Sequence, residues 1–200
     1  MALSFGVTFD YRCPFARNAH EHVVEGLRAG ADWDVRFLAF SLSQNKVAEG
    51  ETSVWDEPEK DSGLLALQLG IAIRDTQPDR FLDAHLALFG IRHDHGKSQR
   101  DEDELRSALA GAGVDVDAAF AEVTSGWPLK TVRDEHERGV SEHTVWGVPT
   151  FIVDDRAAFV RLMDRPRDGI HDPSKAIERV VGLLGGWPEL NEFKHTTLSR

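Results

Sequence analysis

The chain has 200 residues, which suits one globular domain or one domain that carries a large insertion. Its formal net charge is −11, which argues against nucleic acid and anionic membrane surfaces as partners, because both bind clustered cations. No stretch approaches the roughly 20 apolar residues that span a bilayer. Residues 1–5 show neither a basic region nor a long apolar segment, so we expect no signal peptide and a cytoplasmic protein.

The first forty residues predict a strand, a helix and a second strand. Residues 5–10 alternate apolar with small or polar side chains, as a short strand does. Pro14 suits the first turn of a helix, and Gly30 can end that helix with a left-handed cap. Residues 34–40 form the second strand. Such a unit favours a parallel pair with a right-handed crossover.

The middle of the chain, from about 60 to 145, shows helical patterns and no convincing strand. Four or five helices are expected there, at about 64–69, 78–88, 101–110, 116–123 and 129–139.

Strands return near the C-terminus. Residues 150–153 and 157–160 flank an Asp-Asp-Arg turn and predict a hairpin. Residues 173–184 predict a closing amphipathic helix. The order of elements is therefore β-α-β, a helical block, and β-β-α.

The single cysteine, Cys13, excludes an intramolecular disulfide, and a lone cysteine is often only a small buried hydrophobe. Cys13, however, stands between a strand end and a helix start. Free N–H groups and the helix dipole at that position stabilise a thiolate and lower its pKa, and Arg12 and Arg17 could add to this effect. Because Pro14 marks the helix start, we expect Cys13 at the exposed end, partly open to solvent.

A second motif, Gly-Val-Pro-Thr at 147–150, places Pro149 at the opening of the returning strand. By itself it is equally consistent with a plain helix stop followed by a strand.

The two motifs, Cys-Pro-Phe-Ala at 13–16 and Gly-Val-Pro-Thr at 147–150, together resemble those of the DsbA-like thioredoxin family. The resemblance implies an α/β thioredoxin-like fold with a large all-helical insertion. The expected domains are a thioredoxin-like domain (1–55 and 146–185), an inserted helical domain (56–145) and a C-terminal tail (186–200). The layout also suggests the low-molecular-weight-thiol-dependent reductases and the 2-hydroxychromene-2-carboxylate isomerases.

The resemblance also implies roles for five residues. Cys13 is the expected nucleophile, and Pro14 and Phe15 shape the surface beside it. Pro149 is the expected cis-proline facing Cys13. Val148 offers backbone groups to a peptide or thiol ligand.

One position departs from the family pattern, because Ala16 stands where a dithiol motif has its second cysteine. A monothiol needs an external thiol to resolve a mixed disulfide. We therefore expect a thiol–disulfide oxidoreductase or thiol-dependent reductase whose co-substrate is a low-molecular-weight thiol and whose substrates are small disulfides or electrophiles. The alternatives are a thiol-dependent isomerase or transferase, although that family usually has serine near the Cys13 position, and a non-catalytic binding module.

Other candidates are weaker. His93 and His95 flank Asp94 in a polar segment, and we predict no metal site there. His20 and His22 are expected to be solvated. Trp146 is a candidate for lining the active groove. No tightly bound cofactor is expected, and a homodimer is possible.

Overall fold

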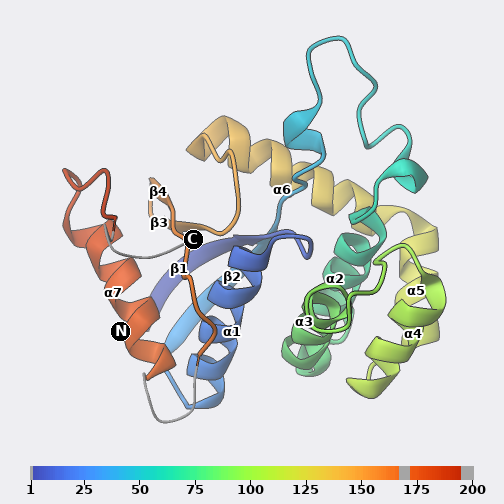
Figure 1. The fold of residues 1–200 in the computed structure, drawn as a ribbon, viewed down its shortest axis with the longest axis horizontal. Helices are drawn as coiled ribbons and strands as arrows, with labels where there is room; N and C mark the ends of the chain where they lie inside the picture. The colour runs from blue at the N-terminus through green and yellow to red at the C-terminus, as the bar shows by residue number, and fades with distance from the viewer. Residues whose placement is uncertain (1, 167–171, 195–200) are drawn as a thin grey trace.

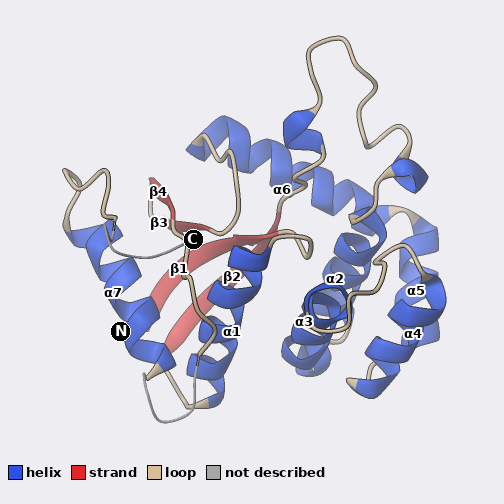
Figure 2. Cartoon of the chain, viewed as in Figure 1, coloured by secondary structure: helices blue, strands red, loops and turns tan. Residues whose placement is uncertain are grey.

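The computed structural model describes residues 2–166 and 172–194. Its centre is a four-stranded sheet in the order β2-β1-β3-β4 (Figures 1 and 2). β1 and β2 are parallel, whereas β3 runs antiparallel to both of its neighbours. The strands are β1 (Leu3–Phe9), β2 (Trp33–Ala39), β3 (Thr150–Val153) and β4 (Arg156–Phe159).

The predicted parallel pair is confirmed. β1 and β2 pair along their whole length, from Leu3 opposite Trp33 to Phe9 opposite Ala39. The crossover is helix α1 (Pro14–Arg28), which begins at the proline and is followed by Gly30 at a φ of +86°. Glycine adopts this left-handed conformation at little cost, so the chain can turn directly into β2.

The predicted helical block is also present, with five helices between β2 and β3. Two short 3-10 turns, η1 (Gln44–Lys46) and η2 (Pro58–Lys60), precede it. The helices are α2 (Leu64–Thr76), α3 (Pro78–His93), α4 (Glu102–Gly111), α5 (Val116–Ser125) and α6 (Trp127–His143).

The closing helix α7 (Pro173–Gly186) packs beside α1 and against β3 and β4 (Figure 1). The helical block meets the rest of the fold through α3, which contacts α1, and through α6, which contacts β2. The block therefore stands at the β2 edge of the sheet.

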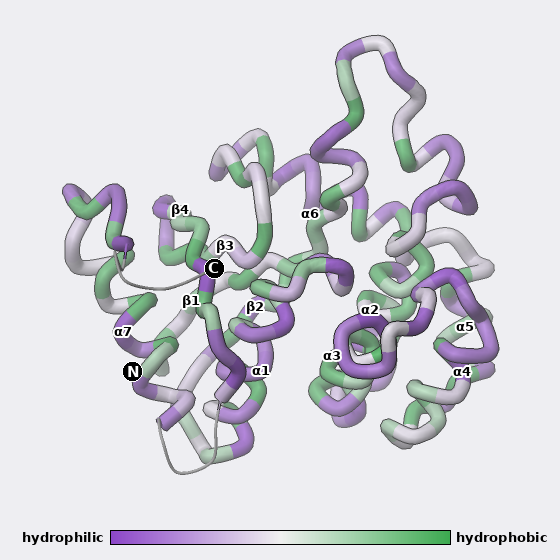
Figure 3. The backbone as a smooth tube through the Cα atoms, in the orientation of Figure 1, coloured by the Kyte–Doolittle hydropathy of each residue, from purple (hydrophilic) through white to green (hydrophobic). Residues whose placement is uncertain are grey.

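One hydrophobic core joins the sheet to the helical block. Phe5 and Phe151 of the sheet belong to the same buried cluster as Leu67 and Leu88 of the block. Apolar segments accordingly follow the strands and recur along the helices in Figure 3. None of the helices in the described ranges combines the length and apolar character of a membrane span.

The domain boundaries expected from sequence remain a prediction. Residues 167–171, within the predicted 146–185 segment, and residues 195–200 of the predicted tail lie outside the described residues, as does Met1.

Candidate active site

Cys13 is the residue that precedes α1, and its backbone is extended, with φ −90° and ψ 120°. Its N–H donates to the Asp10 carbonyl at 3.0 Å, which closes the turn after β1. Its thiol donates to the Val148 carbonyl, with Sγ and oxygen 3.2 Å apart. The Val148–Pro149 peptide bond is cis. The fold thus brings together two motifs that are 135 residues apart.

The loop that carries Val148 is tied to β1, and closed on itself, by hydrogen bonds from the residue after the cis-proline. The Thr150 N–H donates to Thr8 Oγ1 at 2.8 Å, and the Thr150 hydroxyl donates to the Gly147 carbonyl at 2.7 Å. The Pro149 carbonyl accepts from the Val160 N–H at 3.1 Å. The Val148 carbonyl is therefore fixed in front of the thiol.

The thiol itself is more buried and less acidic than its place at a helix start predicts. Cys13 is only 8% exposed, which corrects the expectation of an open side chain. Burial raises the pKa of the Cys13 thiol, and the nearby Asp10 carboxylate adds to the rise. Backbone N–H groups of Ala16 and Phe15 act in the opposite direction, and the rise in pKa prevails. At neutral pH Cys13 is therefore mainly a neutral thiol.

Arg12 does not supply the expected positive field, because it is paired with carboxylates. Its Nη2 lies 2.6 Å from Asp10 Oδ2, and its Nη1 lies 3.2 Å from Asp61 Oδ2. Asp10 is completely buried and also accepts from the Leu42 N–H at 2.9 Å. Two carboxylates around one guanidinium leave this side of the site without excess positive charge.

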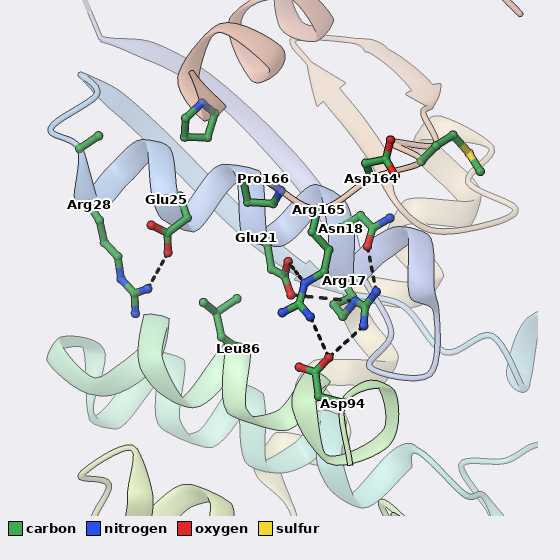
Figure 4. A pocket seen from close by; sticks show the side chains of 13 residues that line it. Arg17, Asn18, Glu21, Glu25, Arg28, Leu86, Asp94, Asp164, Arg165 and Pro166 are labelled. Carbon is green, nitrogen blue, oxygen red and sulfur yellow. Dashed lines mark hydrogen bonds and ion pairs between the residues drawn. The ribbon is translucent and has the colours of Figure 1, made fainter. Parts of the chain in front are cut away.

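Arg17 is also paired. In Figure 4 it and Arg165 converge on Asp94, at 3.1 and 2.9 Å, and Arg165 continues to Glu21 at 2.6 Å. These groups line a cleft of about 1090 Å³ along α1 that does not include Cys13. We assign this cleft no function.

The surface beside Cys13 is aromatic. Pro14 is exposed and Phe15 is half-buried, with the Arg161 guanidinium 5.2 Å from the centre of its ring. Trp146 is 62% exposed in the loop that leads to the cis-proline, and its ring lies 4.6 Å from that of Phe159.

A buried hydrogen-bonded chain beneath this turn was missed in the sequence. Tyr11 Oη lies 2.8 Å from His85 Nδ1, and His85 Nε2 lies 2.9 Å from His20 Nδ1. His20 Nε2 lies 3.1 Å from the Thr8 carbonyl. Because a carbonyl only accepts, His20 Nε2 donates, His85 Nε2 donates to His20, and the Tyr11 hydroxyl donates to His85.

The expectation that His20 and His22 are solvated is wrong. His20 is fully buried and His22 is 7% exposed. His20 lies four residues after Ala16 and four residues before Val24, so the three side chains share one face of the helix. The apolar residues on that face are the sequence signal that could have revealed the burial of His20. Its partner on α3 could not be inferred from spacing.

His93 closes α3 and anchors the turn before Cys13. Its Nε2 donates to the Tyr11 carbonyl at 3.0 Å, and the Gln99 amide donates to the same oxygen at 3.1 Å. Across the described ranges no group of three or more potential ligands could hold a metal ion.

A mixed four-stranded sheet with an inserted helical block, and a cysteine at the start of α1 against the residue before a cis-proline, define a thioredoxin-like fold of the DsbA type. Residues 7–167 match the model of the DSBA-like thioredoxin domain, and the chain belongs to this family. The family resemblance and fold class expected from the sequence are thereby confirmed.

Solved structures with the same fold include two kinds of protein. A 2-hydroxychromene-2-carboxylate isomerase has a TM-score of 0.60 and 15% identity, with 78% of this chain and 88% of that chain covered. DsbA from Pseudomonas aeruginosa has a TM-score of 0.56 and 18% identity, with 90% of this chain and 80% of that chain covered. Reduced DsbA1 from Neisseria meningitidis has a TM-score of 0.60 and 15% identity, with 90% of this chain and 83% of that chain covered. No curated protein matches the chain in sequence.

Proposed function

We propose that the protein is a monothiol oxidoreductase that uses Cys13 and a low-molecular-weight thiol to reduce small disulfides. The observation that carries the proposal is the position of Sγ, at the start of α1 and 3.2 Å from the Val148 carbonyl beside the cis-proline. A disulfide that reaches this point meets the sulfur, the N–H groups at the start of the helix and the backbone of Val148 together.

The proposed reaction has two balanced steps. In the first, the Cys13 thiolate attacks one sulfur of a substrate disulfide, the sulfur–sulfur bond breaks, and the other sulfur leaves as a thiolate that takes a proton from water. In the second, the thiolate of the external thiol attacks the mixed disulfide on Cys13. Cys13 is released, and the external thiol ends in a disulfide with the substrate fragment.

We assign the neighbouring residues to substrate binding. Pro14 and Phe15 form the surface at the helix start, and Val148 and Pro149 form the facing wall. Trp146, exposed on the same loop, extends that wall. Such an enzyme needs a reduced thiol pool, as in the cytoplasm, where we propose that it acts.

The test is reduction of a small symmetric disulfide by glutathione with wild type and Cys13→Ser. Wild type is expected to turn over with a rate that rises with glutathione concentration, and a glutathione adduct is expected on Cys13 by mass spectrometry. Cys13→Ser is expected to fall to the uncatalysed rate. Equal rates in both proteins would exclude a nucleophilic role for Cys13.

A second candidate is a thiol-dependent isomerase or transferase in which Cys13 does not react. The observation that favours it is a buried thiol of raised pKa that donates a hydrogen bond. Such a group can hold the thiolate of a bound small thiol, as a serine hydroxyl can. In this case Cys13→Ser keeps its affinity for glutathione and its activity on an electrophile, whereas thiol–disulfide exchange is absent in both proteins. Thiol binding without turnover would indicate the third alternative, a non-catalytic module.

A further inference from the structure

A second histidine site lies outside the chemistry of Cys13. His136, on α6, is 5% exposed, and its Nδ1 is buried with no hydrogen-bond partner among the described residues. A buried polar atom without a partner opposes folding, and such atoms are rare in native proteins. Phenylalanine would fill similar space without that cost. The imidazole at this position therefore keeps a hydrogen-bonding nitrogen that a ligand could satisfy.

The His136 ring borders a small cavity of about 180 Å³. Its lining residues are Gln44, Trp55, His136, Glu137 and Val140. The imidazole lies with its centre 4.3 Å from that of Phe40 and 5.6 Å from that of Trp55. Val140 is 43% exposed, so the cavity has an apolar rim that opens to solvent. An apolar cavity of roughly this volume is large enough for a benzene ring.

The walls of the cavity are fixed, and they adjoin the loop that faces Cys13. Gln44 Oε1 accepts from the Val54 N–H at 3.0 Å, which holds the segment before Trp55. The next residue, Asn45, donates to the Trp146 carbonyl at 2.8 Å. Trp146 stands two residues before Val148, the residue whose carbonyl accepts from Cys13.

The chemistry of the walls favours an uncharged ligand. Burial lowers the pKa of His136 to about 4, so its imidazole is neutral near pH 7, with one nitrogen that donates and one that accepts. Glu137 is paired with the Arg133 guanidinium at 2.7 Å. The remaining lining residues, Gln44, Trp55 and Val140, carry no charge, so neither an anion nor a cation finds an unpaired opposite charge there.

We propose that this cavity binds a small uncharged aromatic ring that carries one hydroxyl or equivalent hydrogen-bonding group, and that His136 is its polar partner. The ring stacks among Trp55 and Val140, and its hydroxyl meets the imidazole. Turning the imidazole about its Cβ–Cγ bond exchanges nitrogen and carbon positions and offers either nitrogen to the ligand.

The test is a titration of the full chain with phenol and with toluene, followed by the NMR signals of the Trp55 indole N–H and the His136 ring. Phenol is expected to shift both signals and to bind more tightly than toluene. His136→Phe is expected to weaken phenol binding roughly two- to tenfold, which corresponds to the loss of one hydrogen bond. It is expected to leave the affinity for toluene unchanged. Val140→Trp, a change at the partly exposed rim, is expected to abolish binding of both phenol and toluene.

Two further readouts distinguish a ligand-binding His136 from a structural one and separate the cavity from Cys13. His136→Phe is expected to raise Tm or leave it unchanged, because it removes an unpaired buried nitrogen; a clear fall in Tm would make His136 a structural residue. Cys13→Ser is expected to bind phenol like wild type, so a failure of thiol chemistry would not affect the cavity. Absence of any shift with phenol, as for a cavity that holds only water, or equal affinities for phenol and toluene, would overturn the proposal.

Discussion

At the scale of single residues, the acidity of Cys13 is set by competing neighbours. The start of α1 offers N–H groups that favour the thiolate, while burial and the Asp10 carboxylate favour the thiol. Neither Arg12 nor Arg17 compensates, since both are paired with carboxylates. The same position in a helix can therefore hold an acidic or a weakly acidic thiol, depending on what surrounds it.

The raised pKa predicts how Cys13 reacts with iodoacetamide as pH changes. Because only the thiolate is alkylated, the rate in the folded protein is expected to rise about tenfold per pH unit from pH 7 to beyond 8.5 without reaching a plateau. The same protein unfolded in denaturant, with an ordinary cysteine, is the control and should approach its plateau near pH 9 or just above. A folded-state plateau below pH 8 would contradict the burial argument.

Ala16→Cys is expected to give the protein an internal dithiol. Position 16 lies one helical turn from Cys13, and a cysteine there can attack a mixed disulfide on Cys13 without a second molecule. The pre-oxidised variant should oxidise a reduced two-cysteine peptide at least tenfold faster than wild type, in a reaction followed by the mass of the peptide, since the effective concentration of the internal thiol is high.

The matched control is Ala19→Cys, because Ala19 is a fully buried alanine of the same helix like Ala16 but is too far along the helix to reach Cys13. Oxidation of the peptide by wild type as fast as by Ala16→Cys would refute the monothiol argument.

At the scale of elements, the chain from Tyr11 through His85 and His20 to Thr8 joins β1, α1 and α3. Burial lowers the pKa of His20 to about 4 and that of His85 well below its ordinary value. Each histidine also uses one nitrogen as an acceptor, so protonation would break the chain.

This arrangement predicts acid sensitivity. The folded pKa of His20 lies below its unfolded value near 6.5, so its contribution is fully present above pH 6.5 and is lost as pH falls toward 4. The free energy of unfolding, measured with urea, should decrease by roughly 3 kcal/mol over that window from His20 alone. His95→Gln, at an exposed histidine, is the control substitution. A flat profile between pH 6.5 and 4 would show that His20 is not buried as a neutral ring.

The elements themselves could largely be predicted from the sequence, but their side-chain partners could not. Pro14, Pro78 and Pro173 mark helix starts that the structure confirms, because proline suits the first turn of a helix. The burial of His20 depends on His85, 65 residues away, and the loss of positive charge at Cys13 depends on Asp61, 49 residues from Arg12. Local spacing carries no information about such pairs.

At the scale of the whole molecule, the sheet and the helical block share one buried cluster. We expect the protein to unfold as one unit, because neither part keeps its apolar surface covered without the other. Sequence order predicts two domains, 1–55 with 146–185 and 56–145, and the shared core predicts that they do not melt separately.

Hydrogen exchange in increasing urea tests this. Peptides from β1 and from α2 should lose protection at the same midpoint, within about 0.3 M, since two-state unfolding gives coincident transitions. The exposed C-terminal residues near Trp187 are the internal reference and should exchange without added urea. An earlier loss in α2 alone would show that the inserted block is an independent domain.

The turn that precedes Cys13 has a consequence for how such proteins can be recombined. Four residues of the inserted block hold it: Asp61 binds Arg12, His85 binds the Tyr11 hydroxyl, and His93 and Gln99 bind the Tyr11 carbonyl. The inserted block therefore helps to hold the turn that positions Cys13. We expect that a chimera carrying the helical block of a relative would keep Cys13 and its cis-proline. The pKa and the solvent exposure of Cys13, however, would follow the block of the relative.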